Sequence, residues 1–62
     1  MAIREISEEE MLDIINTIKV VNIESDYYHY LGKSLLTTIV LKDGSIIRID
    51  KRDKVTKYSI KL

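Results

Sequence analysis

The sequence predicts an α+β domain in which an N-terminal helix packs on one face of a four-stranded antiparallel meander sheet. Three observations support this fold: a helix-start signal near residue 7, runs of β-branched and aromatic residues from residue 20 onward, and short turns between these runs. Short connections favour antiparallel neighbours. The 62 residues contain neither an internal repeat nor a linker-like stretch, so residues 1–62 are expected to form a single small domain.

The first predicted element is a helix over residues 8–18. Ser7, with Glu10 three residues later, forms a capping box, in which each side chain satisfies the free backbone N–H of the other residue. Ile6 before the cap and Met11 inside the helix fit a hydrophobic staple. One apolar stripe follows from the i, i+3, i+4, i+7 spacing of Met11, Ile14, Ile15 and Ile18.

The rest of the chain alternates between strand-forming runs and turns. Four strands are predicted, over residues 20–30, 35–42, 45–50 and 56–62. Ile3 and Ile6 also alternate with charged residues, which leaves open whether residues 1–6 form a further strand.

The turn Lys42-Asp43-Gly44 decides how the two central strands are aligned. We expect a three-residue loop with Gly44 in the left-handed conformation, in a G1 bulge. This loop places Ile39 opposite Ile47 and separates apolar from polar side chains, whereas a two-residue turn mixes them on both faces.

The same sorting predicts the other registers and assigns side chains to two faces. It pairs Ile23 with Leu41, Tyr27 with Thr37 and, through a four-residue loop at 51–54, Ile47 with Tyr58. The first face, which the helix is expected to cover, contains Val21, Ile23, Ser25, Tyr27, His29, Leu35, Thr37, Ile39, Leu41, Ile47, Ile49, Tyr58, Ile60 and Leu62. The second face contains Asn22, Glu24, Asp26, Tyr28, Tyr30, Leu36, Thr38, Val40, Ile46, Arg48, Asp50, Val55, Lys57, Ser59 and Lys61.

The second face is more apolar than a solvated sheet face should be. One short helix covers one face of a sheet, and an exposed apolar patch with a charged rim marks an interaction surface. We therefore predict that this face is buried in a homodimer or against another protein. The predicted partner-binding residues are Tyr28, Tyr30, Leu36, Val40, Ile46, Arg48, Val55, Lys57 and Lys61.

The charge of the chain is zero overall but divided between its halves. Residues 1–31 carry two basic and seven acidic side chains, and residues 32–62 carry eight basic and three acidic ones, so the halves carry −5 and +5. A zero net charge argues against a dedicated non-specific nucleic-acid binder. The alternative function is nevertheless a nucleic-acid or nucleotide binder, in which tyrosines stack on bases and the basic C-terminal hairpin contacts phosphates. Its candidate residues are Tyr28, Tyr30, Arg48, Lys57 and Lys61.

No motif in the sequence predicts catalysis, a metal site or a cofactor. His29 is the sole histidine, and no cysteine is present. A catalytic histidine needs an orienting partner, and Asp26 would point to the opposite face of a regular strand. The three glutamates at 8–10 are best explained as complements to the helix dipole rather than as metal ligands or a DNA mimic.

No apolar run exceeds three residues, so no transmembrane helix or signal peptide is predicted, and a cytoplasmic location is the default expectation. The predicted function is that of a small non-enzymatic interaction protein with an accessory, regulatory or inhibitor role, including a viral (phage) one.

Overall fold

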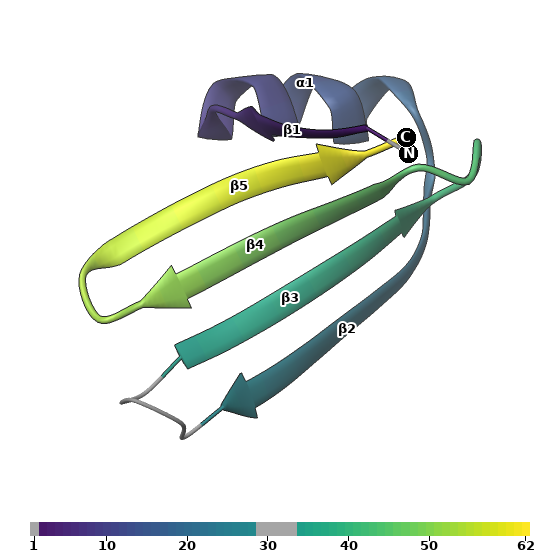
Figure 1. Ribbon diagram of the computed structural model, residues 1–62. Coiled ribbons are helices and arrows are strands. Elements are labelled where there is room, and N and C mark those ends of the chain that lie inside the picture. The colour runs from purple at the N-terminus through teal and green to yellow at the C-terminus, as the bar shows by residue number, and fades with distance from the viewer. Residues whose placement is uncertain (1, 29–33) are drawn as a thin grey trace.

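A computed structural model describes residues 2–28 and 34–62 of the chain. Within these residues the protein forms one helix and one five-stranded antiparallel sheet, in the strand order β1-β5-β4-β3-β2 (Figure 1). The elements are β1 (Ile3–Ile6), α1 (Glu8–Thr17), β2 (Val20–Tyr28), β3 (Ser34–Leu41), β4 (Ile46–Arg52) and β5 (Val55–Lys61). No helix in this part of the chain has the length and apolarity needed to cross a membrane.

The fold class is as predicted, but the sheet has five strands rather than four. The additional strand is β1, which pairs with β5 and places Ile6 opposite Tyr58 and Arg4 opposite Ile60. Its four residues give a weak local signal, and its partner strand lies at the other end of the chain. As a consequence β1 and β2 form opposite edges of the sheet, and α1 connects one edge to the other.

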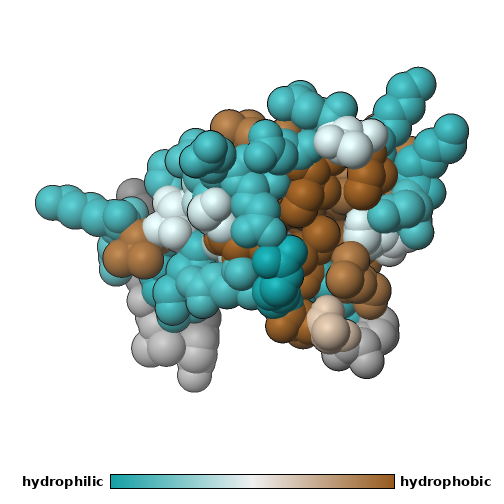
Figure 2. Space-filling model, turned by 90° about the horizontal axis from the view of Figure 1, so that it is seen from above, coloured by the Kyte–Doolittle hydropathy of each residue, from teal (hydrophilic) through white to brown (hydrophobic). Residues whose placement is uncertain are grey.

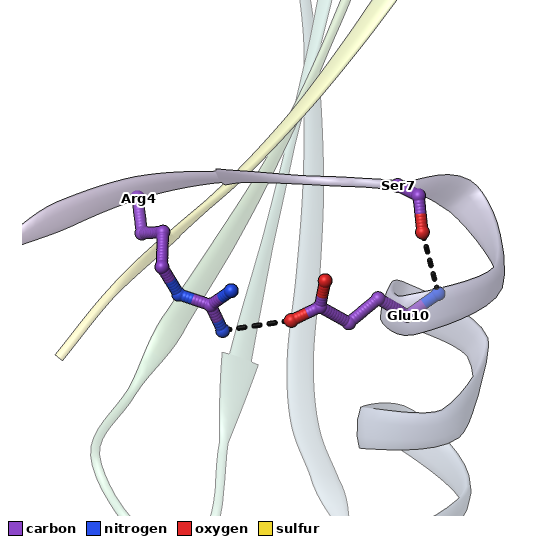
Figure 3. Close-up of polar contacts among 3 residues, drawn as sticks. All are labelled: Arg4, Ser7 and Glu10. Atoms are coloured by element: carbon purple, nitrogen blue, oxygen red, sulfur yellow. Dashed lines mark hydrogen bonds and ion pairs between the residues drawn. The ribbon is translucent and has the colours of Figure 1, made fainter.

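The start of α1 follows the predicted cap in part. The Ser7 hydroxyl oxygen accepts a hydrogen bond from the backbone N–H of Glu10 at 3.1 Å, which is one half of a capping box. The Glu10 carboxylate instead forms an ion pair with Arg4 of β1, at 2.7 Å between Nη2 and Oε2 (Figure 3). Ile6 and Met11, the predicted staple, are both buried in the core. The helix ends at Thr17, one residue earlier than expected.

The β3–β4 loop has the predicted conformation. Leu41 donates its backbone N–H to the Ser45 carbonyl oxygen, which closes a three-residue loop, and Gly44 has a φ of +92°. Ile39 therefore lies opposite Ile47, as expected. A side chain at position 44 would be strained by this positive φ, which glycine adopts without cost.

The other two registers differ from those predicted by two residues. Ile23 pairs with Ile39 rather than Leu41. At the opposite turn, Ile47 pairs with Ile60 rather than Tyr58, because Arg52 and Val55 are paired and only residues 53–54 remain as the turn. Side chains alternate with a period of two, so shifts of two residues keep them on the predicted face.

The hydrophobic core lies between α1 and the part of the first face nearest to it. Six apolar side chains are buried there: Ile6, Met11, Ile39, Leu41, Ile47 and Ile60. The far ends of the strands extend beyond the helix in Figure 1, since ten helical residues span only about 15 Å. The first face is therefore only partly covered. Ser25 and Thr37 on this face are joined by a hydroxyl–hydroxyl hydrogen bond of 3.1 Å and are not part of the core.

The edge strand β2 contributes less to the core than predicted. A register shift between Val20 and Asn22 places Val20 opposite Leu41, so Val20 packs against the core and Val21 does not. Val21 and Ile23 are each 59% exposed. The β-bulge changes which valine faces inward, because an extra residue in one strand breaks the simple alternation.

Asp43 gives the β3–β4 loop a pH-dependent contact. Hydrogen bonds from the hydroxyl and the backbone N–H of Ser45 to Asp43 Oδ1 lower the pKa of this carboxyl below its ordinary value of 3.8. A carboxyl with a lowered folded-state pKa stabilises the fold above its unfolded-state pKa, and this stabilisation is lost as the pH falls through the folded-state value.

Asp43→Asn is therefore expected to lower the unfolding temperature at pH 6 and to have a smaller effect at pH 2. Asparagine keeps the Oδ1 acceptor but loses the charge, and hydrogen bonds to charged acceptors are the stronger ones. The check is the thermal unfolding midpoint of both proteins between pH 2 and pH 6. Two parallel curves would contradict the assigned contact.

Candidate functional site

The second face of the sheet, opposite α1, is the candidate site. The observed register arranges its side chains in rows that run across the strands. The row nearest the helix end of the sheet consists of Asn22, Val40, Ile46, Lys61 and Ile3, and the next consists of Glu24, Thr38, Arg48, Ser59 and Glu5. The third row consists of Asp26, Leu36, Asp50 and Lys57.

An apolar strip occupies the middle of this face. Val40 and Ile46 lie directly opposite each other on β3 and β4, and Leu36 lies two rows further along β3. All three side chains stand on the interior strands β3 and β4 and are half-buried, but none belongs to the core cluster. We call Leu36, Val40 and Ile46 the apolar strip.

Ile3 extends the apolar character of the first row, and sequence reasoning missed it. It stands on β1 beyond Lys61 and is 67% exposed. The alternation of Ile3 and Ile6 with charged residues was a signal for a strand, but nothing in the sequence indicated that this strand pairs with β5. Figure 2 looks down on the end that carries α1 and shows apolar side chains gathered between hydrophilic flanks.

Charge is distributed unevenly across the second face. Two of its acidic side chains, Glu24 and Asp26, are exposed on the edge strand β2, whereas Asp50 stands on β4 and Glu5 on the opposite edge strand β1. Lys57 and Lys61 stand on β5, three strands away, and Arg48 is exposed on β4 between them. On this face acidic side chains thus lie on β2 and basic ones on β5, with Arg48, Asp50 and the apolar strip on β3 and β4 between them.

A hollow of about 290 Å³ lies at the end of the β4–β5 hairpin. It is lined by Asp50, Arg52, Asp53, Val55 and Lys57. Its two basic and two acidic side chains balance, so it offers no concentrated charge for a phosphate or a carboxylate. Asp53, one of its lining residues, lies in the turn of this hairpin and has a φ of 54°.

The structure brings together only some of the predicted partner-binding residues. Leu36, Val40 and Ile46 share the middle of the second face, but Val55 pairs with Arg52 at the hairpin end and is 57% exposed, two strands from Leu36. Tyr28 ends β2 opposite Ser34. Tyr30 and His29 lie outside the described residues.

The basic residues of the C-terminal hairpin do not form one ridge. Lys51 pairs with Thr56 and lies on the first face, whereas Arg48, Lys57 and Lys61 lie on the second. Asp50 lies between Arg48 and Arg52 along β4 and directly opposite Lys57 of β5. In residues 2–28 and 34–62, no three His, Cys, Asp or Glu side chains are grouped to hold a metal ion.

Comparisons of this chain with models of protein families, with curated proteins and with solved structures find no significant match.

Proposed function

We propose that this protein is a small non-enzymatic interaction module that associates through the second face of its sheet, in the first place with a second copy of itself. An accessory, regulatory or inhibitor role fits a protein that acts by occupying a surface. The observation that carries the proposal is the apolar strip on the sheet face that α1 does not cover.

The small size of the core supports self-association. Only six apolar side chains of the described chain are buried, and a 62-residue domain buries a smaller fraction of its surface than a larger one. A solvated face of an antiparallel sheet is normally polar. Covering Leu36, Val40 and Ile46 adds apolar burial that one layer of sheet and one helix cannot supply.

Val40→Arg is expected to abolish association while leaving the fold intact. Val40 belongs to the apolar strip, where it lies opposite Ile46, but stands outside the core cluster, so a charged side chain there disrupts a face-to-face contact and not the packing under α1. The measurement is sedimentation equilibrium over a wide range of protein concentrations, with circular dichroism to confirm the folded state.

Ile23→Arg is the matched control, because it places the same side chain at a 59% exposed isoleucine on the first face. We expect this variant to associate as the unmodified protein does. A protein that remains a 7.2 kDa monomer at millimolar concentration would refute self-association. Equal loss of association in both variants would place the interface elsewhere.

Nucleic-acid binding has less support from the arrangement of charges. Its candidate residues Arg48, Lys57 and Lys61 share the second face with Glu24, Asp26 and Asp50, which oppose a polyanion. A titration of labelled single- and double-stranded oligonucleotides at ~50 mM salt, where counterion release favours binding most, is expected to give a flat fluorescence anisotropy. A steep, salt-sensitive rise would favour the nucleic-acid alternative.

A further inference from the structure

The second face carries enough charge asymmetry to specify how two copies pack. Glu24 and Asp26 stand on β2, and Lys57 and Lys61 stand on β5, with β4 and β3 between these two strands. Glu24, Asp26 and Lys57 are exposed and Lys61 is half-buried, so all four are available at the rim of a contact over the apolar strip.

Two kinds of two-fold axis can stack this face on itself. An axis across the strands places β2 over β2 of the second copy and β5 over β5, so that acid faces acid and base faces base. An axis along the strands, between β3 and β4, places β2 over β5 of the second copy and β3 over β4. Like charges in contact are costly and opposite charges favour an orientation, so the charges of β2 and β5 favour the second axis.

We infer that the occupant of the second face is a second copy of this chain, related by a two-fold axis that runs along the strands between β3 and β4; this inference rests on the proposed function. Such an axis keeps each cross-strand row over the same row of the second copy. Asp26 then faces the partner's Lys57, and Val40 faces the partner's Ile46, with the two sheets aligned about 10 Å apart.

The same geometry implies a weak dimer. Four strands spaced about 4.8 Å apart and about six residues long give a footprint of roughly 400 Å² per subunit. Stable interfaces bury about 800 Å² per partner. We therefore expect association to depend strongly on protein concentration, and the charged rim to determine orientation more than affinity.

Charge reversal on the two strands tests this orientation. One variant, Glu24→Lys with Asp26→Lys, makes the β2 side basic; the other, Lys57→Glu with Lys61→Glu, makes the β5 side acidic. Each is expected to weaken its own homodimer at least about tenfold, since like charges then meet at both rims. An equimolar mixture is expected to form a heterodimer, because both rims of the mixed pair join opposite charges. Sedimentation velocity with one labelled variant measures all three pairings.

The control separates attraction at the second face from general attraction between oppositely charged proteins. It consists of two variants. One carries Glu9→Lys and Asp13→Lys, at exposed helix positions, and the other carries Lys42→Glu and Lys54→Glu, at exposed turn positions. These variants carry the same charge changes away from the second face and are expected to homodimerise normally, with no preference for the mixed pair. If β2- and β5-reversed variants fold poorly, as judged by circular dichroism, the single changes Asp26→Lys and Lys57→Glu give the same test.

Two results would overturn the inferred axis. One is unchanged homodimers of the charge-reversed variants, and the other is a mixed pair no stronger than that of the control. In either case the effect of Val40→Arg still reports on the proposed function, because it tests the face and not the orientation. Loss of association in Val40→Arg with a failed charge reversal would retain the face and reject the axis.

Discussion

Ile47→Ala is expected to remove a large part of the free energy of unfolding of this protein. Ile47 is fully buried at the centre of the core, on an interior strand, with Ile39 and Ile60 as its cross-strand neighbours. Removing a buried isoleucine side chain down to alanine costs about 2–5 kcal/mol, from lost burial and from the cavity left behind. A domain of this length has roughly 3–9 kcal/mol of stability in total.

Urea unfolding followed by circular dichroism measures this loss. Ile47→Val is a first control and is expected to cost about 0.5–1.5 kcal/mol. Ile23→Ala is a second, because Ile23 belongs to the same cross-strand row but is 59% exposed; surface changes of this kind usually stay within about 0.5 kcal/mol. A similar loss for Ile47→Ala and Ile23→Ala would contradict the position of the core.

Ile6→Ala is expected to destabilise the protein by about 2–4 kcal/mol, which makes it a direct test of β1. Ile6 is 6% exposed, stands opposite Tyr58 of β5 and belongs to the core cluster. If residues 3–6 were an unpaired tail, the same substitution would change little. The cost follows from the buried side chain, because large-to-small changes in a core leave a cavity.

Ile3→Ala provides the comparison within the same strand. Ile3 is 67% exposed on the second face, and its truncation is expected to stay within about 0.5 kcal/mol when unfolding is measured at a protein concentration too low for association. Equal effects at positions 3 and 6 would mean that β1 does not pack on β5 with Ile6 turned toward the core.

The accuracy of the sequence prediction varied with the separation of the interacting residues. Ser7 and Glu10 are three residues apart, and the predicted hydrogen bond from the Glu10 backbone N–H to the Ser7 hydroxyl oxygen is present. Gly44 and its loop also followed from adjacent residues. The Glu10 side chain did not complete the capping box, because Arg4 on the neighbouring strand provided a charged partner that helix signals do not include.

The sequence predicted the sheet face of the candidate site but only some of its residues. Leu36, Val40 and Ile46 lie on the side opposite the helix, as predicted. Two of the predicted strand registers were wrong, but each differs from the observed register by two residues, which leaves the face unchanged. Val55 was grouped with them from its face alone, whereas its place along β5 puts it at the hairpin end. Ile3 was absent from the predicted site because its strand had not been placed.

The sequence by itself determined the helix, the central hairpin and the face on which most residues of the four predicted strands stand, because these depend on capping, turn conformation and a two-residue alternation within a few neighbouring positions. Only the tertiary structure decided that β1 pairs with β5, that a bulge in β2 turns Val21 away from the core, and that the ten-residue α1 leaves Ile23 exposed. These features depend on contacts between segments distant in the chain, whose free energy arises once the whole sheet has assembled.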